Sequence, residues 1–235
     1  AHARCGATPV VRLQTGGSAS YRSQILVRDD SSFEDLTQLA GRRFGFGAPL
    51  STSSHLVPRA MLTNVGVELE ELDCRFYGHH ERAARAVLLG EVDACGVRDV
   101  VGERFRDRGL LARSEPIPNF PLVVRPEASR ELIASILHAL VEIPAESPAV
   151  RRRMAGWDEE LAGGLAPASD REYAPVRRLV ERIFGPAGLK GSEAELEPHL
   201  SCQRCPLDDH APGADPGSGD ADPLGPFSSR AHRQP

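Results

Sequence analysis

Four consecutive hydroxyl side chains form the strongest candidate binding site in the sequence. They are Ser51, Thr52, Ser53 and Ser54, and they stand between a predicted strand and a predicted helix. The first turn of a helix leaves backbone N–H groups without intrahelical partners and carries about half a positive charge. One hydroxyl is enough to cap a helix, so four exceed that need. The pattern predicts an anion site for a phosphate-like group, with an ordinary N-cap as the alternative.

Two further strand ends carry side chains that could contact a ligand. A predicted strand over 74–77 leads to His80, and one over 92–97 leads to Arg98 and Asp99. The carboxyl ends of parallel strands gather at one edge of a sheet, where ligands bind. There, His80 could donate to a ligand oxygen or bind a metal, and Arg98 could pair with an anion. The alternatives are a capping or surface histidine and a surface ion pair of little energetic value.

A second cluster lies near the C-terminus and has the composition of a metal site. His199, Cys202, Cys205 and His210 combine a CxxC motif with flanking histidines, which is a tetrahedral zinc set. Pro206 follows where a c-type haem motif requires histidine. A disulfide or two free thiols are the alternatives for the two cysteines. Zinc is the one cofactor that these residues suggest.

The elements that position these residues alternate between strands and helices, which predicts an α/β fold with a mostly parallel sheet. Residues 1–20 have few periodic apolar positions and are expected to be an irregular lead-in. Ser32 to Asp35 is expected to cap a short helix, and Asp170 to cap the last one. The predicted strands cover 21–27, 44–47, 74–77, 92–97 and 121–124, and the predicted helices 36–39, 56–62, 81–89, 132–141 and 173–183.

The composition excludes several classes of protein. The chain has 235 residues with 28 Lys and Arg, 33 Asp and Glu, and a net charge of -5, so a general nucleic-acid binder is not expected. No apolar run approaches the roughly 18 residues of a membrane span. The signatures GxSxG, P-loop and HExxH are absent, so no enzyme is predicted. The chain begins at Ala1 without a signal-peptide pattern, and its compartment cannot be read from these residues.

Seven motifs follow one another in order along residues 1–185. They are the runs 21–31, 36–46, Ser51-Thr52-Ser53, Gly78-His79-His80, Gly90-Glu91-Val92-Asp93-Ala94, Ile117-Pro118-Asn119-Phe120-Pro121 and 169–177. The ordered set resembles the PhnD-type family of phosphate-, phosphonate- and phosphite-binding proteins of ABC transporters. This resemblance implies a type II periplasmic-binding-protein-like fold, with two lobes that are joined by a hinge and close on the ligand.

The resemblance also implies a division of the chain. Part of lobe I and the hinge would occupy 1–36, lobe II 37–115, and the return to lobe I with the C-terminal helices 116–187. Residues 188–235 would be a largely disordered tail, since proline, glycine and aspartate dominate there and apolar periodicity is lost, above all in 211–235. The first strands and helices of lobe I would be missing.

By the same resemblance, the hydroxyl cluster binds the oxygens of a phosphonate. Ser51, Thr52 and Ser53 would donate to them, Tyr21 would match the family's tyrosine near the hinge, and His80 would match its histidine.

Two positions depart from the family pattern. Arg98, with Asp99 next to it, stands where the family has a carboxylate, and Phe120 stands where an aspartate is expected. Since those carboxylates can bind an amino group or a protonated oxygen, their loss argues against an aminophosphonate ligand. A fully ionised oxyanion facing Arg98 is expected instead.

The function implied is that of a periplasmic or other extracytoplasmic solute-binding protein, which delivers a small tetrahedral oxyanion to an ABC transporter permease. One alternative is a sensor domain of the same fold that feeds a sensor kinase. A second is an interaction module built on zinc or thiols in the tail, and a third is a remnant that no longer binds ligand.

Overall fold

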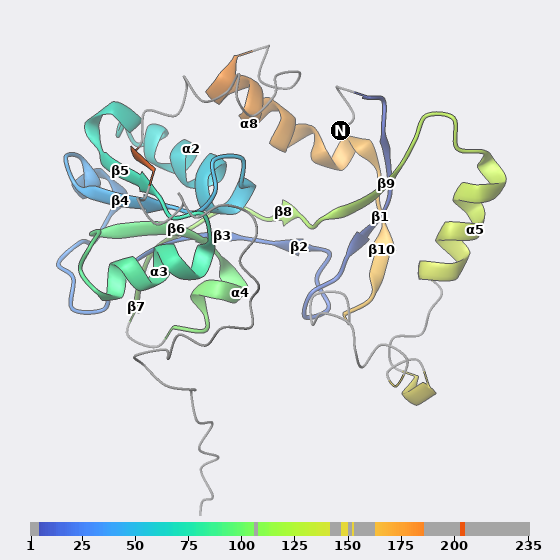
Figure 1. Ribbon diagram of the computed structural model, residues 1–235, viewed down its shortest axis with the longest axis horizontal. Helices are drawn as coiled ribbons and strands as arrows, with labels where there is room; N and C mark the ends of the chain where they lie inside the picture. The colour runs from blue at the N-terminus through green and yellow to red at the C-terminus, as the bar shows by residue number, and fades with distance from the viewer. Residues whose placement is uncertain are drawn as a thin grey trace, which may run out of the picture. The chain divides into compact units, whose positions relative to one another are not determined.

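A six-stranded mixed sheet is the largest element of the fold (Figure 1). The computed structural model describes residues 5–105, 108–141, 147–149, 152, 163–185 and 203–204. Within them the strand order is β11-β5-β4-β6-β3-β7. The strands are β3 (Ser23–Arg28), β4 (Arg43–Phe46), β5 (Asp73–Phe76), β6 (Ala94–Arg98), β7 (Arg108–Arg113) and β11 (Gln203–Arg204).

The direction of β3 sets where the strand ends lie. β4 pairs in parallel with β5 and β6, and β11 in parallel with β5, as predicted for most of the sheet. The other two pairings are antiparallel, those of β3 with β6 and β7. The reason is that β3 brings the chain into this sheet and β7 takes it out. The carboxyl ends of β4, β5 and β6 therefore share one edge with the start of β3, where Ser23 pairs with Arg98.

Alternation along β3 divides the core between the two faces of this sheet. Ile25 and Val27 pack with Phe44 and other apolar residues below α2 (Val57–Thr63). Leu26 points to the other face, where it packs with Val87 and the alanines of α3 (His80–Leu88). One layer of helix thus covers each face (Figure 1). Smaller helices complete these layers, namely η1 (Leu36–Leu39), η3 (Leu69–Glu71) and α4 (Asp99–Gly102).

A second, three-stranded sheet is antiparallel throughout, in the order β10-β1-β9. Its strands are β1 (Thr8–Leu13), β9 (Pro121–Val124) and β10 (Leu165–Pro167). The expected irregular lead-in over 1–20 is therefore wrong, because β1 is the central strand. Its apolar stretch is short, and both of its partners come from the second half of the chain. The hydrophobic periodicity of residues 1–20 therefore could not reveal that this segment pairs with β9 and β10.

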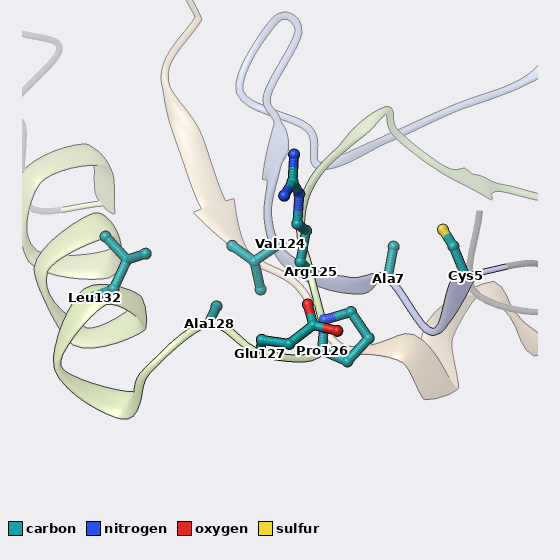
Figure 2. A pocket seen from close by; sticks show the side chains of 8 residues that line it. All are labelled: Cys5, Ala7, Val124, Arg125, Pro126, Glu127, Ala128 and Leu132. Carbon is teal, nitrogen blue, oxygen red and sulfur yellow. The ribbon is translucent and has the colours of Figure 1, made fainter.

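The helix α5 (Arg130–Val141) contacts this sheet, and much of the apolar surface around it is exposed. None of its residues is buried, and Leu132 is 52% exposed. Leu122 and Val123 on β9 are also exposed. A hollow of about 850 Å³ lies here, and Figure 2 shows Leu132 on α5, Val124 at the end of β9 and Pro126 beyond it. Figure 2 shows none of the predicted site residues among those that line it.

A two-stranded ribbon connects the two sheets. β2 (Ser20–Tyr21) leads into β3, and β8 (Ile117–Pro118) follows β7, with Tyr21 paired to Ile117. The helix α8 (Ala174–Phe184) packs against α2, one of the helices on the larger sheet. Its Phe184 packs with Leu56, which directly precedes α2. Ser169, and not the predicted Asp170, caps the short helix η4 (Asp170–Tyr173) ahead of α8, because Ser169 and Glu172 form a capping box.

Several further expectations from the sequence concern helix capping and the boundaries between the parts of the chain. The capping box before η1 is formed by Asp35 and Gln38, and not by the predicted Ser32 and Asp35. Apart from β11, the tail from residue 188, including 211–235, lies outside the described residues. The boundaries at residues 36, 115 and 187 stay predictions.

Within the described part, no helix combines the length and hydrophobicity that crossing a bilayer requires.

The described cysteines differ in state. Cys74 on β5 is disulfide-bonded. Cys95 on β6 is fully buried with a free thiol, and burial raises its pKa far above the ordinary value. The disulfide at Cys74 was not among the sequence expectations, which considered a disulfide for Cys202 and Cys205 alone.

Candidate functional site

The candidate site lies where the carboxyl ends of β4, β5 and β6 face the β2–β8 ribbon. This edge is the one at which the sequence placed its ligand residues. The structure brings most of them together within hydrogen-bond or ring contact of one another. They and their neighbours are Tyr21, Thr52, Ser53, His80, Arg98, Asp99, Asn119 and Phe120.

The helix after β4 begins at Ser51, which is extended and caps it. Its Oγ accepts the N–H of Ser54 over 3.2 Å. The first turn, η2 (Thr52–Leu56), is a π-helix, and α2 continues from it without a break. Because Ser51 alone provides the cap, the hydroxyls of Thr52 and Ser53 are not needed for it.

Tyr21 brings the ribbon into contact with this helix start. The side chains of Ser53 and Thr52 lie close enough to its hydroxyl to lower its pKa. Burial has the larger effect and raises the pKa of Tyr21, so that the charge of Arg98 and the two neighbouring hydroxyls only partly offset it. The phenol is therefore neutral at physiological pH and keeps a proton to donate.

Arg98 places a positive charge beside the hydroxyl groups. Its guanidinium carbon lies 4.6 Å from the centre of the Tyr21 ring and 5.1 Å from that of Phe120. Its Nη2 donates to Oδ1 of Asn119 over 3.1 Å. The residue is only 4% exposed, so the alternative of a surface ion pair is wrong for Arg98.

His80 and Asp99 lie on either side of Arg98 and are bonded to backbone groups. Nδ1 of His80 accepts the N–H of Arg98 over 3.1 Å, which leaves the opposite nitrogen, Nε2, as the N–H donor of a neutral ring. The Asp99 carboxylate accepts the N–H of Arg22 over 2.8 Å and that of Val100 over 2.9 Å. Both of its oxygens are thus engaged by backbone donors.

Ser54, the last of the four hydroxyls, has a different environment. Its side chain is buried, and no hydrogen-bond partner of its Oγ is found among the described residues. It lies against Gly47, since a Cβ built on Gly47 would come within 2.3 Å of that Oγ. This contact explains why glycine occupies the turn between β4 and the helix.

Asn119 is a site residue to which the sequence assigned no role. Its Oδ1 accepts from Arg98 and from the N–H of Phe120, and its Nδ2 donates to Oγ1 of Thr15. Its carbonyl accepts the hydroxyl of Tyr173 over 2.7 Å, and burial raises the pKa of Tyr173 to about 12. The only signal was its place in the motif 117–121, because its partners are distant in sequence.

A buried histidine supports the helix start from within the core. His55 is fully buried, and its Nδ1 lies 2.5 Å from the carbonyl oxygen of Pro49. Its ring contacts those of Phe46 and Phe76 edge-on, at 4.9 and 5.0 Å between centres. Burial lowers the pKa of His55 to about 4, so the ring is neutral and acts as part of the core.

The tail cluster of His199, Cys202, Cys205 and His210 lies outside the described residues. Elsewhere in the described chain, no group of three or more His, Cys, Asp or Glu side chains could hold a metal ion. The zinc hypothesis stays a prediction.

Comparison with known proteins gives consistent matches. A family model for the periplasmic phosphonate substrate-binding protein of ABC transporters matches residues 1–173. The phosphate-import protein PhnD of Mycolicibacterium smegmatis is 27% identical over 199 residues, which are 75% of this chain and 62% of that protein. The chain thus spans less than two thirds of the length of this relative.

Two solved structures show the same fold. PhnD1 from Prochlorococcus marinus in complex with methylphosphonate superposes with a TM-score of 0.63 at 17% identity, over 75% of this chain and 72% of that one. The binding-protein component of an ABC phosphonate transporter from Pseudomonas aeruginosa gives 0.57 at 20% identity, over 83% and 70%. The predicted α/β fold, that of type II periplasmic-binding proteins, is confirmed.

Proposed function

The chain belongs to the family of periplasmic phosphonate-binding proteins of ABC transporters, and on this basis we propose that it binds a small tetrahedral oxyanion and delivers it to such a transporter. The ligand class is phosphonate, phosphite or phosphate. The likeness to PhnD1, whose structure contains methylphosphonate, supports this class, as does the family match over residues 1–173.

The contact between Tyr21 and the start of the helix is the observation that carries the proposal. Three hydroxyls, those of Tyr21, Thr52 and Ser53, meet at the first turn of a helix, with the guanidinium of Arg98 beside them. Hydroxyl groups, N–H groups of a first turn and a guanidinium all donate to anionic oxygen. Together they suit a ligand with several negatively charged oxygens around one centre.

Each residue has a defined part in this binding. Thr52 and Ser53 donate their hydroxyls to the ligand oxygens, and Ser51 holds the first turn in place as its cap. Neutral Tyr21, whose hydroxyl lies near those of Thr52 and Ser53, donates its proton to the ligand. Because Tyr21 lies on the ribbon, its bond to the ligand links the ribbon to the six-stranded sheet, which is what a hinge closure requires.

We also propose an extracytoplasmic location. Family membership supports it, and so does the disulfide at Cys74, since disulfides persist mainly in oxidising compartments.

Isothermal titration of the whole chain with phosphate, phosphite, methylphosphonate and sulfate tests the binding. The variant T52A/S53A removes both donors, and Thr63→Ala removes a hydroxyl at the far end of the same helix as a control. At about 1.5–3 kcal/mol per hydrogen bond to a charged group, the double variant should bind at least a hundredfold more weakly. Equal affinity of the double variant and the control would show that these hydroxyls do not hold the ligand.

A further inference from the structure

A buried positive charge at the edge of the site bears on which ionised form of the ligand is bound. We propose that Arg98 makes the site select the doubly ionised form of a tetrahedral oxyanion and reject ligands that carry an ammonium group. This inference rests on the function proposed above and adds a residue that determines specificity within the same site.

The side chain of Tyr21 connects the positive charge of Arg98 to the hydroxyl donors of the helix start. The ring of Tyr21 lies under the guanidinium, 4.6 Å from its carbon, while the hydroxyl of the same ring contacts Thr52 and Ser53. An anion held by these hydroxyls is therefore separated from the guanidinium of Arg98 by no more than the width of the Tyr21 ring. Because Arg98 is 4% exposed, water screens this attraction far less than it would at a surface. The charge of Arg98 acts on the Tyr21 hydroxyl more strongly than the opposite charge of Asp99 does. Each further negative charge on the ligand therefore strengthens binding, and a positive charge on it weakens binding.

The guanidinium is held in position before any ligand arrives. Asn119 accepts from its Nη2, and Asn119 is itself fixed by the N–H of Phe120 and by Thr15. The rings of Tyr21 and Phe120 stack at 5.8 Å and form an aromatic surface for the guanidinium. A planar, preorganised group of this kind loses little conformational entropy when it binds an oxyanion.

The hydrogen-bonding groups point to the same selectivity. A singly protonated oxyanion presents an O–H that requires an acceptor. Asp99 is the carboxylate among the predicted site residues, and both of its oxygens already accept backbone N–H groups. Of the remaining groups, the guanidinium of Arg98 can only donate, whereas the hydroxyls of Thr52 and Ser53 can donate or accept. Such a site stabilises an ionised oxygen better than a protonated one.

Any test must distinguish the titration of the ligand from the titration of the ionisable groups around Arg98. Tyr21 and Tyr173 have raised pKa values and stay neutral between pH 5 and 8. His80 accepts the N–H of Arg98, Asp99 follows Arg98 in the chain, and Arg22, which lies between β2 and β3, donates its N–H to Asp99. Among these groups, the imidazole of His80 is of a type that titrates in this range. Sulfate separates the two effects, because it stays doubly ionised throughout and reports on the titration of the protein alone.

The experiment is isothermal titration of the whole chain at pH 5 to 8 with methylphosphonate, sulfate and 2-aminoethylphosphonate. Phosphoryl groups lose their second proton at a pKa of about 6 to 7. The methylphosphonate affinity, divided by that of sulfate, should fall up to tenfold per pH unit below that value. Sulfate should bind, and 2-aminoethylphosphonate should bind at least tenfold more weakly than methylphosphonate at pH 8.

Variants at Arg98 assign these effects to one residue. Arg98→Gln should bring the affinities for methylphosphonate and 2-aminoethylphosphonate close together, while Arg98→Lys keeps the charge and should retain the preference. Arg104→Gln removes the same charge from an exposed side chain, ion-paired to Glu81 at 3.8 Å, and should change nothing. Melting curves confirm that the variants fold.

The outcomes separate this inference from the function on which it rests. If none of the anions binds at any pH, the proposed function is wrong. If the anions bind but methylphosphonate affinity is independent of pH, or sulfate does not bind, the assignment to Arg98 is wrong. Equal discrimination by Arg98→Gln and the wild-type chain would overturn it as well.

Discussion

The hydroxyl of Ser23 donates to the carbonyl oxygen of Ser53 over 2.6 Å, within the buried start of β3. This bond joins the strand that enters the larger sheet to the first turn of the helix at the site. It fixes the backbone of Ser53, whose hydroxyl contacts Tyr21.

Replacing Ser23 with alanine should therefore affect both stability and binding. The Ser53 carbonyl would lose its buried partner, at a cost of about 1–3 kcal/mol. We expect a lower free energy of unfolding in urea and a weaker affinity for the oxyanion. Ser135→Ala is the control, because Ser135 makes a similar hydroxyl-to-carbonyl bond within the exposed helix α5. A Ser23→Ala variant with the affinity of this control would show that the bond does not position the site.

The buried histidine predicts loss of stability in mild acid. The pKa of His55 is about 4 in the folded chain and near 6.5 when unfolded. The unfolded chain thus binds a proton between these values that the folded chain does not, so stability falls as the pH is lowered from 6.5 to 4. At about 1.4 kcal/mol per pKa unit, the full effect is about 3 kcal/mol.

Urea denaturation at pH 7 and pH 5 measures this effect. His55→Gln removes the imidazole and should lose less stability on acidification than the wild-type chain. Parallel losses in both proteins would mean that other groups cause the acid sensitivity.

The close approach of Gly47 and Ser54 predicts a specific pair of substitutions. A Cβ on Gly47 would lie 2.3 Å from the Oγ and 2.8 Å from the Cβ of Ser54. Gly47→Ala should therefore destabilise the chain by about 1–3 kcal/mol through overpacking. Adding Ser54→Gly removes both clashing atoms, so the double variant should be more stable than the sum of the single effects predicts. Simple additivity in thermal unfolding would argue against this contact.

Reduction of the disulfide at Cys74 should lower the melting temperature. Loss of a native disulfide typically costs about 2–5 kcal/mol. Thermal unfolding with and without dithiothreitol measures it, and Cys74→Ala is the control, since its melting temperature should not respond to the reductant. An equal response of the variant would assign the effect to other cysteines.

Local patterns predicted the parts of the site that lie within one stretch of chain. The hydroxyls after β4 and the charged residues at the end of β6 could be placed at strand ends because a strand leads directly into a helix there. An N-cap was the alternative for the four hydroxyls, and the structure assigns it to Ser51, which the sequence had placed among the ligand donors.

The remaining parts depend on contacts between distant segments. Asn119 reaches Arg98 and Thr15, and β1 pairs with strands from the second half of the chain. His55 has the polarity of a surface residue and is buried because Phe46 and Phe76 surround it. Hydrophobic periodicity cannot report such contacts, since each residue pattern taken by itself fits several environments.

The thiol of Cys95 provides a natural probe of how the larger sheet opens. It lies in the middle of β6, fully buried and protonated, so a thiol reagent can modify it only when the sheet separates locally or the chain unfolds. Its labelling rate would therefore measure the free energy of the least costly opening that exposes β6. Slower labelling in the presence of an oxyanion would indicate that ligand binding stabilises the strand that ends at Arg98.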